Sequence, residues 1–124
     1  RKTLAGLSAR YPLGVVTGRP RSDARRFLEE QGVADLFSTT VCMEDGPSKP
    51  DPAPVKLAME RLGAATAWMV GDTPDDMRAA RTAGVLPFGL PAEGDDPVSM
   101  RAALAAAGAV KVIEEAIEFE ELVP

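Results

Sequence analysis

The segment from residue 67 to residue 84 constrains the fold of this chain more than any other. A short apolar run, 67–70, ends in Gly71-Asp72, and a helical pattern follows almost at once and stops at Gly84. A short apolar run that leads directly into a helix is typical of a buried strand in a parallel sheet. Because parallel sheets bind ligands beyond the carboxyl ends of their strands, the segment also marks a candidate site.

The same alternation of apolar runs and helical patterns extends along the whole chain. Most helical patterns have a capping residue, an early proline or a terminating glycine. The expected strands are 13–17, 39–43, 67–70, 85–90 and 109–113, and the expected helices are 2–10, 22–31 (capped by Ser22), 52–62, 74–83, one opened by Asp96-Pro97, and 114–121. This order predicts an α/β fold in one domain over residues 1–124, with a parallel sheet covered by helices on both faces.

Composition limits the classes of function. The chain has 124 residues, of which 45% are hydrophobic and 27% charged, as in ordinary globular proteins. Its net charge of −5 argues against a nucleic-acid partner, and no apolar run is long enough for a membrane span. The single cysteine, Cys42, predicts a small core residue in a protein of the reducing cytoplasm. Since the chain has no histidine, acid–base chemistry must use carboxylates, lysine or metal-bound water.

Three carboxylates surround the first turn of the helix expected at residues 74–83. Asp72 and Asp76 form an oxygen-rich pair of the kind that holds Mg²⁺ together with water and phosphate. The alternative is structural: Asp72 and Thr73 would cap the helix, and Asp75 and Asp76 would complement its dipole. The motif alone leaves both interpretations open.

Two other segments carry groups that bind phosphate. Thr17 and Gly18 end the first expected strand and offer a hydroxyl and a backbone N–H, to which the next helix would add its positive end. Lys49 stands in the proline-stiffened segment 48–52, where its ammonium would have a fixed position. The structural alternatives are a plain Thr-Gly turn and a solvent-exposed lysine. Because parallel strands end at one edge of a sheet, Thr17, Lys49 and Asp72 together predict a phosphoryl-transfer pocket.

The order and content of these segments resemble the haloacid dehalogenase superfamily, in particular its phosphoglycolate-phosphatase-like subfamily with a helical cap after the first strand. Thr17 resembles the second family motif, Lys49 in Lys-Pro-Asp-Pro the third, and Gly71-Asp72-x-x-x-Asp76 the fourth. The resemblance covers residues 3–113 and implies a three-layer α/β/α core of the Rossmann type. It also implies a Mg²⁺-dependent hydrolase of small phosphorylated metabolites.

The resemblance implies a role for each matched residue. Thr17 and the Gly18 amide would bind the phosphoryl group, and Lys49 would stabilise its charge and the nucleophile. Asp72 would bind Mg²⁺, with Asp76 supporting the ion directly or through water. Thr17, Lys49 and Asp72 are therefore the expected catalytic residues.

Arg19, directly after Gly18, has three interpretations. It could contact the phosphate of a substrate, or it could pair with a carboxylate such as Glu44 or Asp45. The third interpretation is an ordinary surface arginine that has neither role.

One family motif has no counterpart in this sequence. The first motif, Asp-x-Asp at the end of a leading strand, carries the nucleophile, and the chain contains no Asp-x-Asp. We therefore expect these residues to be the C-terminal part of a longer protein and inactive alone. The first strand, its aspartates and the cap would come from the same or another chain.

The absent strand has a structural consequence. In the family it lies between the strands that end here at Thr17 and Gly71, so we expect an open sheet edge on each and marginal stability without a partner strand. An alternative of another class is an inactive phosphate- or partner-binding module on the same fold. Within the superfamily, dehalogenase, phosphonate hydrolase and phosphomutase activities also remain open.

Overall fold

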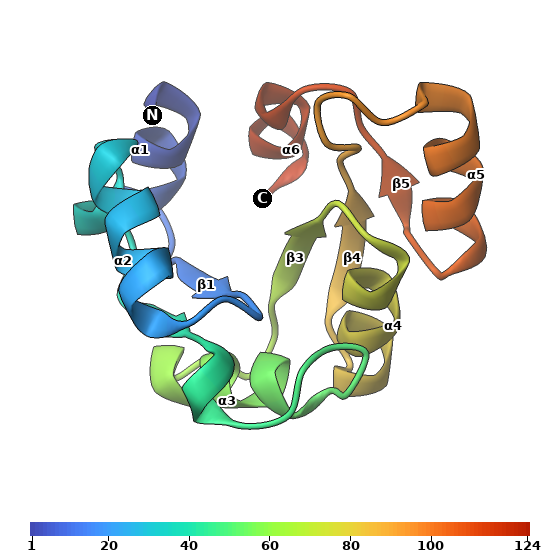
Figure 1. Ribbon diagram of the computed structural model, residues 1–124. Coiled ribbons are helices and arrows are strands. Elements are labelled where there is room, and N and C mark those ends of the chain that lie inside the picture. Colours follow the sequence, from blue (N-terminus) through green and yellow to red (C-terminus); the bar gives the residue numbers. More distant parts are fainter. The chain divides into compact units, whose positions relative to one another are not determined.

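The computed structural model describes residues 1–124, and their contacts gather into two compact units. Unit 1 consists of residues 1–48 and 53–65, and unit 2 of residues 49–52 and 66–124. Each unit has its own parallel sheet, and Figure 1 labels helices and strands of both. None of the helices has the length and apolar character that crossing a membrane requires.

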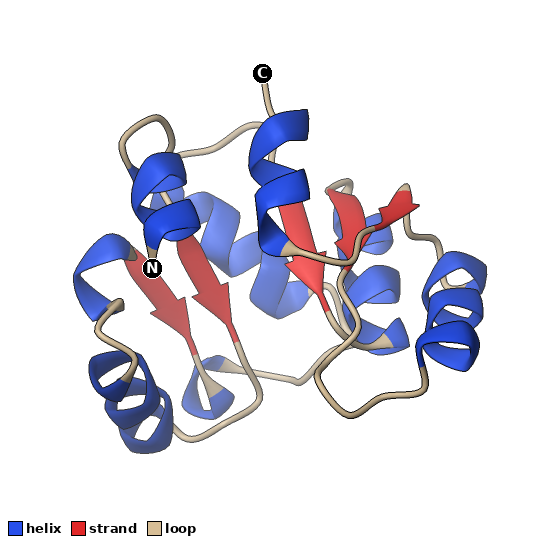
Figure 2. Ribbon diagram, turned by 90° about the horizontal axis from the view of Figure 1, so that it is seen from above, coloured by secondary structure: helices blue, strands red, loops and turns tan.

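Unit 1 is built on two parallel strands, β1 (Gly14–Val16) and β2 (Thr39–Val41), which run side by side in Figure 2. Helix α3 (Ala53–Leu62) packs on this pair. A Cβ added at Gly14 would lie 3.3 Å from the side chain of Leu62, so glycine allows the close contact between strand and helix. The other elements of unit 1 are helices α1 (Lys2–Ser8) and α2 (Arg21–Glu30) and the short 3₁₀ turns η1 (Ala34–Leu36) and η2 (Met43–Asp45).

Unit 2 holds a three-stranded parallel sheet in the order β3-β4-β5. The strands are β3 (Trp68–Gly71), β4 (Leu86–Gly89) and β5 (Lys111–Val112), and the helices are α4 (Pro74–Ala83), α5 (Pro97–Ala106) and α6 (Ala116–Leu122). Each strand but the last is followed by a helix that returns the chain to the start of the next parallel strand.

The core of unit 2 lies on both faces of its sheet. Phe88 of β4 stacks on Trp68 at a ring distance of 4.9 Å and meets Phe119 of α6 at 5.3 Å. The next residue, Gly89, faces Leu104 of α5, whose side chain is 0% exposed. Because successive residues of a strand point to opposite faces, α5 and α6 cover opposite sides of this sheet. The expected α/β class is confirmed.

The strands form two sheets rather than one continuous sheet. In its own sheet β1 pairs only with β2, and β3 pairs only with β4. These are the two strands whose other edges we expected to be open. Cys42 is the expected core residue, with 3% of its surface exposed.

Three helix starts differ from the sequence-based expectation, and that of helix α6 is at Ala116 instead of residue 114. Helix α2 begins at Arg21 after Pro20, so the predicted cap at Ser22 is wrong. Helix α3 begins at Ala53, one residue after Pro52, which was expected at the first helical position. Helix α2 can begin at Arg21 because Glu44, a carboxylate from another part of the chain, accepts its first backbone N–H, as described below.

Candidate functional site

The end of β3 and the first turn of α4 form one tight hydrogen-bonded turn. The hydroxyl of Thr73 accepts the backbone N–H of Asp76 at 3.2 Å. In return, Oδ2 of Asp76 accepts the backbone N–H groups of Asp72 and Thr73, at 3.0 and 3.2 Å. This reciprocal capping confirms the predicted cap at Thr73 and gives Asp76 a capping role that the sequence did not predict. A Cβ at Gly71 would lie 2.6 Å from Oδ2 of Asp76, so the close approach requires glycine.

The second carboxylate oxygen of Asp76 pairs with a lysine. Its Oδ1 accepts a hydrogen bond from Nζ of Lys49, and the two side chains are only 6% and 17% exposed, respectively. Burial alone would raise the pKa of Asp76, but the hydrogen bond and charge of Lys49, together with the groups of Thr73, lower it. Asp76 is therefore a buried carboxylate that stays charged and holds the lysine at this strand end.

Asp72 presents an exposed carboxylate at the same strand end. Partial burial and the negative charge of Asp76 both raise the pKa of the Asp72 carboxyl. No three acidic or cysteine side chains of the chain gather into a metal-binding group. The exposed carboxylate of Asp72 could accept a cation here, whereas both oxygens of Asp76 already bind Lys49 and backbone N–H groups.

Thr17 follows β1 in unit 1. Its backbone N–H donates to the carbonyl of Val41 at 2.9 Å, which continues the ladder with β2. Its hydroxyl accepts the N–H of Arg19 at 3.2 Å, so the residues form a local hydroxyl-capped turn. A Cβ at Gly18 would meet no other atom within 4 Å, and the fold itself therefore does not require glycine there.

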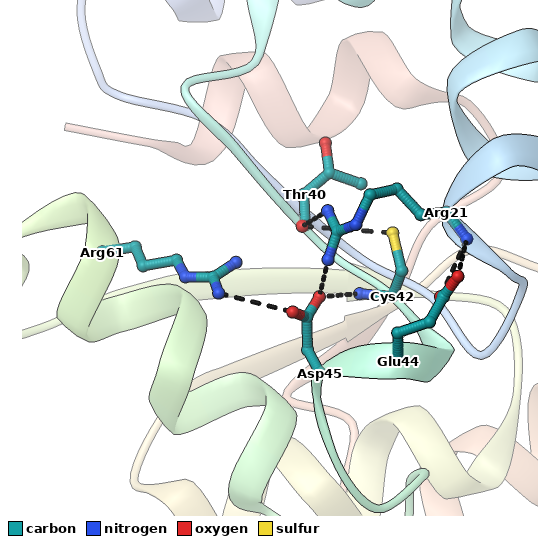
Figure 3. Close-up of polar contacts among 6 residues, drawn as sticks. All are labelled: Arg21, Thr40, Cys42, Glu44, Asp45 and Arg61. Carbon is teal, nitrogen blue, oxygen red and sulfur yellow. Dashed lines mark hydrogen bonds and ion pairs between the residues drawn. The ribbon is translucent and has the colours of Figure 1, made fainter.

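Arg19 does not pair with either carboxylate that the sequence suggested. Its guanidinium lies 5.2 Å from the ring centre of Phe27, in cation–π geometry. Glu44 and Asp45 bind Arg21 instead, as Figure 3 shows. The proposed ion pair of Arg19 with those residues is therefore wrong.

The first N–H of α2 also has a protein partner. The backbone N–H of Arg21 donates to both carboxylate oxygens of Glu44, at 2.9 and 3.1 Å. We had expected the positive end of this helix to be available to phosphate, and a carboxylate of the chain takes its first donor instead. A contact over 23 positions leaves no local signal in the sequence.

The structure thus brings some of the predicted residues together within each unit. Lys49, Asp72 and Asp76 meet at the end of β3 in unit 2. Thr17, with Gly18 and Arg19, follows β1 in unit 1.

Comparison with known proteins shows the family of this chain. Residues 1–89 match the family model described as haloacid dehalogenase-like hydrolase. An imidazoleglycerol-phosphate dehydratase of Phytophthora nicotianae is 48% identical over 91 residues, which are 70% of this chain and 20% of that protein. A phosphoglycolate phosphatase of Rhodospirillum rubrum is 43% identical over 86 residues, 66% of this chain and 36% of that protein.

The fold has matches among solved structures. A predicted phosphoglycolate phosphatase from Haemophilus somnus 129PT has a TM-score of 0.83 and 27% identity, covering 98% of this chain and 54% of that one. The chain therefore spans between a fifth and about half of the length of these proteins. The family model matches most of the chain, and the chain shares its fold with the solved structure from Haemophilus somnus. The chain therefore belongs to the haloacid dehalogenase-like hydrolase family.

Proposed function

We propose that this chain supplies the phosphate- and Mg²⁺-binding side chains of a phosphatase that hydrolyses small phosphate monoesters. One observation carries the proposal: buried Asp76 holds Lys49 beside the exposed carboxylate of Asp72, at the carboxyl end of β3. Phosphoryl transfer needs a fixed cation next to a carboxylate that can bind a metal ion. Family membership and the phosphoglycolate phosphatase relative support this reaction class.

Each residue would act on the phosphoryl group in a definite way. The ammonium of Lys49, held by Asp76, would oppose the negative charge that develops on the phosphoryl oxygens. The Thr17 hydroxyl and the Gly18 N–H would donate hydrogen bonds to phosphoryl oxygens, and the open space at Gly18 supports close approach of a ligand to the backbone. Arg19 would have to leave the ring of Phe27 to add a further phosphate contact.

The proposed metal ion follows from the acidic residues at the end of β3. Mg²⁺, when bound, would lower the repulsion between the phosphate and the attacking nucleophile. Asp72 would hold the ion, because its carboxylate is exposed and lies at the same strand end as the negative charge of Asp76. Asp76 would support it indirectly, since both of its oxygens already bind Lys49 and backbone N–H groups.

The nucleophile in this proposal lies outside the 124 residues. An aspartate of the first family motif would attack phosphorus and expel the alcohol, which a second aspartate would protonate. Water would then hydrolyse the aspartyl phosphate and release orthophosphate. The chain alone would be inactive, and the intact protein would act on phosphorylated metabolites in the reducing cytoplasm, for which the free and buried Cys42 is suited.

The test is the Lys49→Ala substitution in the intact protein. We expect turnover of p-nitrophenyl phosphate with Mg²⁺ to fall roughly 10²-fold, from the loss of one preorganised charge donor. The control is Lys56→Ala, which removes an exposed lysine of α3 and should leave turnover unchanged. Unchanged turnover in Lys49→Ala would end the assignment, and a wild-type protein that binds orthophosphate but hydrolyses nothing would favour the binding-module alternative.

A further inference from the structure

Asp45 is the centre of a charged cluster in unit 1 (Figure 3). Its Oδ2 accepts the N–H of Cys42 at 2.8 Å and pairs with Nη2 of Arg21, and its Oδ1 lies 3.4 Å from Nη2 of Arg61. The Asp45 side chain is 13% exposed, whereas the side chains of Arg21 and Arg61 are 40% and 39% exposed, so water screens these ion pairs in part. A single carboxylate thus connects the start of α2, the end of β2 and the last turn of α3.

Arg21 reinforces this connection through its other groups. Its Nη1 donates to the carbonyl of Thr40 at 3.2 Å, and its backbone N–H donates to Glu44. Two residues earlier, the carbonyl of Arg19 accepts the N–H of Met43 at 2.9 Å. The backbone from residue 19 to residue 21 is therefore fixed to the segment 40–45 at several points.

The position of this cluster in the sequence gives it a functional meaning. Arg21 directly follows the phosphate-binding loop proposed at residues 17–20, and Asp45 directly precedes the loop 46–50 that carries Lys49. The contact between Arg21 and Asp45 therefore acts together with the backbone contacts of residues 19 and 21 to hold the end of the Thr17 loop against the segment 40–45. Small displacements of groups that contact a reacting centre are costly, and about 1 Å can lower a rate by 10².

We propose that Arg21 and Asp45 form a clamp that holds the loop of Thr17 against the segment 40–45 of unit 1, in the conformation that binds a phosphoryl group. They are positioning residues, because they act through this loop and not on the substrate. The inference rests on the proposed function, since it takes Thr17 as a phosphate-binding residue.

The first test measures steady-state hydrolysis of p-nitrophenyl phosphate by the intact protein, well below the melting temperature of each variant. For Asp45→Asn we expect kcat to fall about tenfold while KM changes less than about twofold, because the lost interaction orients groups in the transition state. Arg21→Lys keeps the charge but not the planar fork, so its loss should be smaller. The control is Asp23→Asn, which removes the exposed pair with Arg26 on the same helix α2 and should leave kcat unchanged.

The second test does not depend on turnover. Amide ¹H–¹⁵N shifts of the Asp45→Asn protein should change at Thr17 and Gly18, whereas Asp23→Asn should change shifts on α2 alone. Shifts confined to residues 40–46, or a kcat equal to that of the wild type, would overturn the clamp. If the wild type hydrolyses no phosphate ester, the proposed function fails, and the shifts at Thr17 and Gly18 still decide whether the clamp exists.

Discussion

Replacing Asp76 with alanine tests the central contact of the candidate site. The change removes a carboxylate that accepts two backbone N–H bonds, at 3.0 and 3.2 Å, and pairs with Lys49. Hydrogen bonds to a charged group contribute about 1.5 kcal/mol or more each, and breaking one partner of a buried pair costs about 3–5 kcal/mol. Because these contributions overlap in one side chain, we expect the free energy of unfolding to fall by about 3–4 kcal/mol.

The matched control lies one residue earlier on the same helical turn. Asp75 forms an exposed pair with Arg78 at 3.2 Å, three positions along α4. Its replacement by alanine should cost about 0.5 kcal/mol, as expected for an exposed helical ion pair. Urea unfolding of the protein followed by circular dichroism measures both values. A difference of less than about 1 kcal/mol between Asp76→Ala and Asp75→Ala would refute the view that Asp76 organises this strand end.

Three further changes follow from the packing and the charges. Leu104→Ala empties a fully buried position under β4 and should lower the free energy of unfolding by about 3 kcal/mol in urea titrations, and a loss below about 1 kcal/mol would contradict the core described here. Gly71→Ala places a methyl group against the carboxylate of Asp76 and should lower the melting temperature, whereas an unchanged value would mean that the turn can relax. The backbone hydrogen bond from Cys42 lowers the pKa of Asp45, so its stabilisation is present at neutral pH and is lost as the pH falls below about 4. Urea unfolding between pH 7 and pH 3 should show this acid loss in the wild type and less of it in Asp45→Asn, and identical pH profiles would contradict the contribution of Asp45.

Local sequence signals determined some elements completely. Helix α4 was predicted with its observed bounds, because Thr73 caps it, Pro74 opens it and Gly84 closes it in the left-handed conformation, with a φ of 79°. Helix α2 has no such local cap. Its first N–H is satisfied by Glu44, and only the folded chain brings that carboxylate to the helix.

The same distinction applies to the candidate site. The motif around Asp72 and Asp76 indicated a charged strand end, but the sequence left capping and metal binding as alternatives. The structure gives Asp76 the capping contacts and the pairing with Lys49. Arg19 and Arg21 are almost equally distant from Glu44 and Asp45 in the sequence, and only the folded chain, which brings the start of α2 to the turn η2, selects Arg21.

Mg²⁺-dependent hydrolysis of a phosphate monoester by the intact protein, compared between wild type and Asp72→Asn, tests the proposed function most directly. Asp75→Asn serves as the control, because it removes a neighbouring charge that pairs only on the helix surface. We predict that wild-type turnover requires Mg²⁺, disappears with a chelator and falls about 10²-fold or more in Asp72→Asn, while Asp75→Asn remains active. Turnover that survives the chelator, or that is equal in Asp72→Asn and the wild type, would contradict the assignment of this strand end as a metal-assisted phosphoryl site.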